Sequence, residues 1–208
     1  MWGRGATADN STRQITSINE LIDLVEADLA YANGKMDTAD VQRWVDSANA
    51  LLQKAESANS GSQYGPAVAY AGAARELAMI AYSNMADELT AEALPSNGQI
   101  HAKHRGLPGD ATALTQAQAS YVLANAYNRL VAQGAVTGGS AEAAAYLAKA
   151  QQAYSDGYAA YQAGNYESAA AFARLAGQLS GVASSVANAA TAPANSDTPV
   201  TVPAPNFQ

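Results

Sequence analysis

Residues 64–81, YGPAVAYAGAARELAMIA, decide the fold, because they return 102 residues later as residues 166–183, YESAAAFARLAGQLSGVA. The matching side chains are spaced by threes and fours along the chain. Such spacing returns to one face of an α-helix, so the repeated feature is a stripe of buried side chains. The paired positions are Tyr64 and Tyr166, Ala67 and Ala169, Tyr70 and Phe172, Ala71 and Ala173, Ala74 and Ala176, Leu77 and Leu179, Ile80 and Val182, and Ala81 and Ala183.

A fainter echo lies upstream, where similar residues are 100 rather than 102 positions apart. The change of offset predicts two additional loop residues in the second copy, between the positions equivalent to Ala50 and Tyr64. An internal repeat of this length indicates tandem structural units. The fainter pairs are Ile22 and Val122, Gly34 and Gly134, Met36 and Val136, Val45 and Ala145, Ala48 and Ala148, and Ala50 and Ala150.

We therefore predict an all-α fold, with six helices as two tandem copies of a three-helix unit packed into one helical bundle with extended termini. Ser17 with Glu20, and Thr115 with Gln118, form capping boxes that predict helix starts. Prolines and glycines between the periodic segments predict loops. The expected organisation is a polar arm (1–13), a first repeat (14–91), a linker (92–114), a second repeat (115–191) and an extended Pro/Thr-rich tail (192–208).

The composition limits the partners of this chain. Hydrophobic residues make up 49%, much of it alanine, whereas charged residues make up only 14% and the net charge is −7. Nucleic-acid binding needs clustered lysine and arginine, which are absent, and an anionic membrane surface is disfavoured for the same reason. No stretch approaches the ~20 apolar residues of a membrane span. The expected partners are other protein subunits, including copies of itself, with a small-molecule ligand as the alternative.

Motifs that carry chemistry are sparse. The absence of cysteine excludes disulfides, thiolate zinc sites, iron–sulfur clusters and thiol catalysis. No Glu-x-x-His pair, phosphate-binding glycine-rich loop or nucleophile motif of hydrolases occurs. We predict no cofactor and no catalytic residue. The low lysine content and the Pro/Thr-rich end are typical of an exported protein, periplasmic, cell-surface or extracellular, and we recognise no signal peptide in this chain.

The two histidines, His101 and His104, lie in the predicted linker beside Lys103 and Arg105. Their spacing would let both bind one metal ion. A working site needs further ligands, however, and Asp110 is the only acidic residue nearby. A solvated basic loop explains these residues better, so we predict no metal site.

Residues 153–176 resemble a tetratricopeptide helical hairpin. The resemblance rests on Gly157, on the stretch YQAGNYESA (161–169), and on Phe172 and Ala176. In that family a small residue on one helix faces a small residue on the next, and a turn of this Gly-Asn-Tyr type joins them. The resemblance covers 24 of the 208 residues. It implies a scaffold for protein interaction and no catalysis.

Tyrosine is unusually frequent, with 11 copies, and several lie around the turn near Gly164. The rings either fill gaps between alanine-lined helices, or form an aromatic surface for a peptide, a glycan or a second subunit. In the tail, prolines prevent a helix, and spaced apolar side chains would suit a groove on a partner. The candidate interface residues are Tyr158, Tyr161, Tyr166, Val200, Val202 and Phe207.

Three functions compete. The first is a non-catalytic structural or scaffolding subunit of an envelope or extracellular assembly, which the absence of catalytic motifs favours. The second is a module that binds a small ligand or peptide in a pocket between the repeats, lined by tyrosines and Trp44. The third is an enzyme in which acidic residues of separate helices converge. The acidic residues of the first helix are interpreted as a solvated face, and they are Glu20, Asp23, Glu26 and Asp28.

Overall fold

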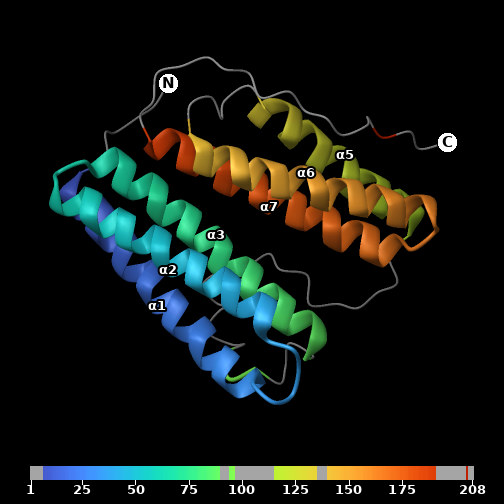
Figure 1. The fold of residues 1–208 in the computed structure, drawn as a ribbon, viewed down its shortest axis with the longest axis horizontal. Coiled ribbons are helices and arrows are strands. Elements are labelled where there is room, and N and C mark those ends of the chain that lie inside the picture. The colour runs from blue at the N-terminus through green and yellow to red at the C-terminus, as the bar shows by residue number, and fades with distance from the viewer. Residues whose placement is uncertain (1–6, 90–93, 97–114, 135–139, 191–204, 206–208) are drawn as a thin grey trace. The chain divides into compact units, whose positions relative to one another are not determined.

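The computed structural model describes residues 7–89, 94–96, 115–134, 140–190 and 205 of this protein (Figure 1). Of these residues 87% are helical, and none belongs to a strand. The predicted all-α fold with six helices is therefore confirmed for the part of the chain that the structure describes.

The chain divides into two compact units, residues 1–110 and 111–208, with a boundary that falls within the predicted linker 92–114. Unit 1 contains α1 (Ala8–Ala32), α2 (Ala39–Ser60) and α3 (Tyr64–Glu88). Within it, α3 packs against both α1 and α2, and its contact with α2 is the more extensive.

Unit 2 contains α5 (Gln116–Gly134), α6 (Ala141–Gln162) and α7 (Tyr166–Ala189). The order of contacts is the same as in unit 1, since the last helix, α7, packs most extensively on α6 and less so on α5. The superposition of the two units stays a prediction.

The repeated stripe of residues 64–81 and 166–183 lies in the core of each unit. Leu77 on α3 is 0% exposed and Leu179 on α7 is 1% exposed, and both are surrounded by small residues of their own helix. Ala74 and Ala176 are completely buried. Six of the eight predicted pairs are buried in both copies, the exceptions being the first pair and the pair of Tyr70 with Phe172. The predicted helical face is thus confirmed.

The register predicted for the upstream echo is wrong. Val45 on α2 is buried, but Ala145, its predicted equivalent at offset 100, is exposed on α6. At offset 102 every buried position of α2 finds a buried position on α6, and Val45 corresponds to Leu147. The loops 61–63 and 163–165 have equal length, so the two additional residues predicted in the second copy do not exist. Alanine occupies buried and exposed positions alike, so pairs such as Ala48 with Ala148 and Ala50 with Ala150 do not define the register.

The start of the first helix also differs from the prediction. Helix α1 begins at Ala8, where the Thr7 hydroxyl oxygen accepts a hydrogen bond from the backbone N–H of Asn10 at 3.3 Å. Ser17 is an exposed residue inside the helix, so the predicted capping box with Glu20 is wrong and the polar arm ends before Ala8. The second predicted capping box is confirmed, because Thr115 and Gln118 exchange hydrogen bonds at the start of α5.

A polar contact explains the additional helical turns of α1. The buried hydroxyl of Ser11 donates to the side-chain oxygen of Asn59 near the end of α2, and the Asn59 amide donates to Thr12 at 3.2 Å. The first turns of α1 are therefore held on α2 by hydrogen bonds, next to the buried side chain of Ile15. A hydrophobic pattern does not reveal such a segment.

Candidate functional site

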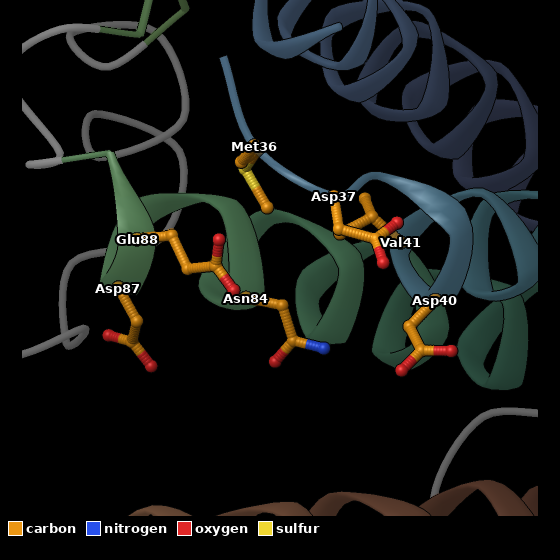
Figure 2. A pocket seen from close by; sticks show the side chains of 7 residues that line it. All are labelled: Met36, Asp37, Asp40, Val41, Asn84, Asp87 and Glu88. Carbon is orange, nitrogen blue, oxygen red and sulfur yellow. The ribbon is translucent and has the colours of Figure 1, made fainter. Parts of the chain in front are cut away.

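A cleft of about 310 Å³ lies in unit 1, where the first turn of α2 meets the last turns of α3 (Figure 2). Met36 and Asp37 belong to the loop between α1 and α2. In this loop Gly34, at φ +82°, adopts a left-handed conformation that suits glycine and lets the chain turn after α1. The lining residues are Met36, Asp37, Asp40, Val41, Asn84, Asp87 and Glu88.

Four of the lining residues carry carboxyl groups, two at the N-terminus of α2 and two at the C-terminus of α3, where the helix dipoles have opposite effects on negative charge. Asp37 accepts the backbone N–H of Ala39 at 3.0 Å, and Asp40 forms an exposed ion pair with Arg43 at 2.9 Å. Both lie at the N-terminus of α2, whose dipole stabilises negative charge. Asp87 and Glu88 lie in the last turn of α3, which contains no basic residue and whose dipole disfavours negative charge. A cation bound in the cleft would therefore offset the unfavourable interaction of Asp87 and Glu88 with the α3 dipole.

The geometry of this acidic cleft does not suit a metal ion. Within the described ranges, no group of three or more His, Cys, Asp or Glu residues is placed to hold one. Figure 2 shows the acidic side chains spread along α2 and α3, with Met36 between them in this view. Val41, a core residue, adds apolar surface. This combination suits an organic cation with an apolar part. His101, His104 and Asp110, predicted not to form a metal site, lie outside the described residues.

The predicted interface tyrosines lie within unit 2. Tyr158 and Tyr166 are half-buried, whereas Tyr161 is only 7% exposed and its hydroxyl accepts a hydrogen bond from the Gln116 side chain at 3.1 Å. The ring centroids of Tyr161 and Tyr166 are 5.6 Å apart. These tyrosines connect α5, α6 and α7 to one another, which agrees with the interpretation that the rings fill gaps between the helices. The half-buried rings of Tyr158 and Tyr166 also reach the surface.

Tyr154 lies at the centre of a second group of rings. Its ring stacks on Tyr158 at 6.3 Å between centroids and lies 5.9 Å from that of Tyr127. Burial, followed by the proximity of the Tyr158 and Tyr127 hydroxyls, raises the pKa of Tyr154. Its buried hydroxyl has no hydrogen-bond partner among the described residues. Tyr154 therefore belongs to the core, and its hydroxyl costs free energy there.

Other predicted site residues are not described or are not brought together. Val200, Val202 and Phe207 lie outside the described residues, and of the tail only Pro205 is described, half-buried. Trp44 is half-buried on α2 and does not line the acidic cleft.

Four large apolar side chains among the described residues are exposed, and the sequence pattern did not indicate their exposure. Tyr121 and Val131 on α5 are 69% and 47% exposed, and Phe172 on α7 is 37% exposed. Tyr31 in unit 1 is 41% exposed, but the Lys35 ammonium lies 2.9 Å from its ring centroid. The uncovered apolar side chains are therefore concentrated in unit 2.

Asp28 contradicts the interpretation of the first helix as having a solvated acidic face. Glu20, Asp23 and Glu26 are exposed, but Asp28 is 0% exposed. Its carboxylate accepts hydrogen bonds from the backbone N–H of Ser96, at 3.0 Å, and from the Ser96 hydroxyl. The helical spacing indicates this burial, because Asp28 lies on the same face of α1 as the buried Leu21 and Val25.

No protein-family model, curated protein or solved structure matches this chain. Among the described helices, none has the length and apolar character needed to cross a membrane.

Proposed function

We propose that this protein is a non-catalytic structural or scaffolding subunit that acts through protein–protein contacts in an envelope or extracellular assembly. The observation that carries the proposal is the exposure of three large apolar side chains in unit 2, Tyr121 and Val131 on α5 and Phe172 on α7. Large apolar side chains are stabilised when a partner covers them, and tyrosine and phenylalanine are enriched in interface cores.

The charge of unit 2 supports the same proposal. Its helices α5, α6 and α7 carry three acidic and three basic residues, whereas most of the net negative charge lies in unit 1. A nearly neutral surface approaches a second copy of itself without electrostatic repulsion. We therefore propose another copy of this chain as a partner. The low lysine content of the whole chain favours the exported setting. The charged residues of these helices are Arg129, Glu142, Lys149, Asp156, Glu167 and Arg174.

Size-exclusion chromatography with multi-angle light scattering tests this proposal on the full chain. The chain should self-associate as its concentration rises, and Tyr121→Glu should weaken the association. Asn125→Glu is the matched control, because Asn125 is exposed one turn later on the same helix and receives the same charge. A chain that is monomeric at every concentration, or variants that associate equally, would contradict self-assembly through α5.

The acidic cleft of unit 1 favours a second candidate function, the binding of a small ligand. Its lining combines four carboxyl-bearing residues with Met36 and Val41, and its volume of about 310 Å³ suits a small organic cation. Helix α3 supplies two of these acids at the end where its dipole disfavours negative charge. This ligand site would lie inside one unit, and not between the repeats as the sequence analysis predicted.

Calorimetric titration with putrescine, a diamine, tests the second candidate. Binding should be lost in the double variant Asp87→Asn and Glu88→Gln. The control is Glu56→Gln, which removes an exposed carboxylate of α2 that does not line the cleft. Equal binding by both variants would mean that putrescine responds only to the overall negative charge.

A further inference from the structure

The segment Leu94–Ser96 returns to α1 after the end of α3. Two of its three residues are buried, with Leu94 at 3% and Ser96 at 2% exposure, whereas Pro95 is exposed. Ser96 donates both its backbone N–H and its hydroxyl to the carboxylate of Asp28, which lies 68 positions earlier in the sequence. A buried apolar side chain and two hydrogen-bond donors within three residues therefore attach this turn to the core of unit 1.

Among the described residues, no basic side chain contributes to the pKa of Asp28, which responds to burial and to Ser96. The buried residues of α2, Val41 to Ala55, are all apolar. From α3, the titratable neighbour is Tyr82, which is buried and whose pKa is raised by burial and by the charge of Asp28. Among the described residues, Ser96 therefore supplies the hydrogen bonds that satisfy this buried carboxylate. A buried charge that loses such donors is costly.

We propose that Asp28 and the segment Leu94–Ser96 form an intramolecular latch, which holds the beginning of the linker between the two units on α1 and whose strength depends on the protonation of Asp28. The latch fixes on α1 the chain that follows α3, and its opening releases Leu94–Ser96 from that helix.

The sign of the pH dependence follows from the burial of Asp28. Burial raises its pKa, and the two hydrogen bonds from Ser96 lower it by less. With the latch open, water reaches the carboxyl group and its pKa returns toward the ordinary value. The closed latch therefore binds the proton more tightly than the open one. Acidification favours the closed state, and a rise in pH through the raised pKa weakens it.

The absence of cysteine from the chain makes the latch measurable. In Leu94→Cys, the buried thiol should react slowly with 4,4′-dithiodipyridine, at a rate that reports opening of the segment. Ser57→Cys, at an exposed position of α2, provides the rate of an accessible thiol at each pH. The protection of Cys at position 94, relative to this reference, should decrease as the pH rises from acidic to neutral.

Two variants in the Leu94→Cys background then test the mechanism. Ser96→Ala removes one donor to the carboxylate and should increase labelling at neutral pH by about tenfold, as expected for a hydrogen bond to a charged group. Asp28→Asn removes the charge and should abolish the pH dependence of protection. Circular dichroism verifies that each variant retains its helices.

Three results would overturn the latch. If the thiol at position 94 reacts as fast as that of Ser57→Cys, the segment Leu94–Ser96 is not docked on α1. Unchanged labelling in Ser96→Ala would show that Ser96 does not hold it. An unchanged pH profile in Asp28→Asn would show that Asp28 does not control it.

Discussion

Gly157 on α6 lies so close to α7 that a Cβ atom added to it would stand 3.0 Å from the Cβ of Phe172. The same added atom would lie 3.1 Å from the carbonyl oxygen of Ala169 and 3.3 Å from the backbone nitrogen of Ala173. Two of these three neighbours are backbone atoms, which do not move aside without shifting the helix. The close approach of α6 and α7 therefore depends on glycine at this position.

The first prediction is that Gly157→Ala destabilises the protein. Overpacking costs about 1–3 kcal/mol, against about 1 kcal/mol gained from the better helix propensity of alanine. Gly181→Ala on α7 is the matched control, because its added Cβ meets nothing within 4 Å and should raise stability. Urea unfolding of both variants measures the difference. Equal stabilisation by the two substitutions would mean that α6 and α7 are not in close contact at Gly157.

The second prediction concerns the repeated leucines. Leu77→Ala and Leu179→Ala should each lower the free energy of unfolding by about 2–5 kcal/mol, through lost burial and the cavity that remains. Val131→Ala, at a position 47% exposed, should change it by about 0.5 kcal/mol or less. A small effect at either leucine would contradict its assignment to the core of its unit.

The third prediction separates two buried tyrosines. Tyr154→Phe should leave stability unchanged or increase it, because the hydroxyl that is removed has no hydrogen-bond partner among the described residues. Tyr161→Phe should lower stability by about 0.5–1.5 kcal/mol, because it removes the acceptor of the Gln116 side chain. Thermal unfolding of the two variants provides the comparison, and a loss of stability in Tyr154→Phe alone would refute the assignment.

The fourth prediction is a pH dependence of stability that comes from Asp28. The pKa of Asp28 is raised from its ordinary value of 3.8, so the folded chain binds this proton more tightly than the unfolded chain. Its contribution is present in full below the ordinary pKa and is lost as the pH rises through the raised value. Asp28→Asn should therefore gain stability relative to the natural chain between acidic and neutral pH.

Denaturant unfolding at several pH values measures this difference. Asp23→Asn, which changes an exposed carboxylate of the same helix, should remain parallel to the natural chain over that range. Parallel curves for Asp28→Asn would mean that burial does not perturb Asp28.

The fifth prediction concerns the tail. Deletion of residues 192–208 should leave the helices folded, because they end at Ala189, and should weaken self-association if Val200, Val202 or Phe207 binds a partner. Circular dichroism and light scattering on the truncated chain measure the two effects. Unchanged association would assign the contact to the helical units alone.

Much of this protein was predictable from local pattern. The spacing of Leu77 and Leu179 among small residues predicts two equivalent helices, because a helix returns to the same face every three to four residues. Thr115 and Gln118 predict the start of α5 equally well, since a capping box involves residues only three apart. These features depend on residues that are close together in the sequence, so the sequence alone predicts them.

Other features required the tertiary structure. Alanine fits buried and exposed positions, so the register of α2 against α6 became clear only when burial distinguished Leu147 from Ala145. The first turns of α1 depend on Asn59, far along the chain on α2. Asp28 has the same helical spacing as the core residues and the same charge as its exposed neighbours. Among the described residues, Ser96, 68 positions away, donates the hydrogen bonds to its buried carboxylate. The sequence by itself determined which segments form helices and which faces of α3 and α7 are buried. Contacts between distant residues decided where α1 begins and how a carboxylate is satisfied in the core, because hydrogen bonds that close only in the folded chain leave no periodic signal.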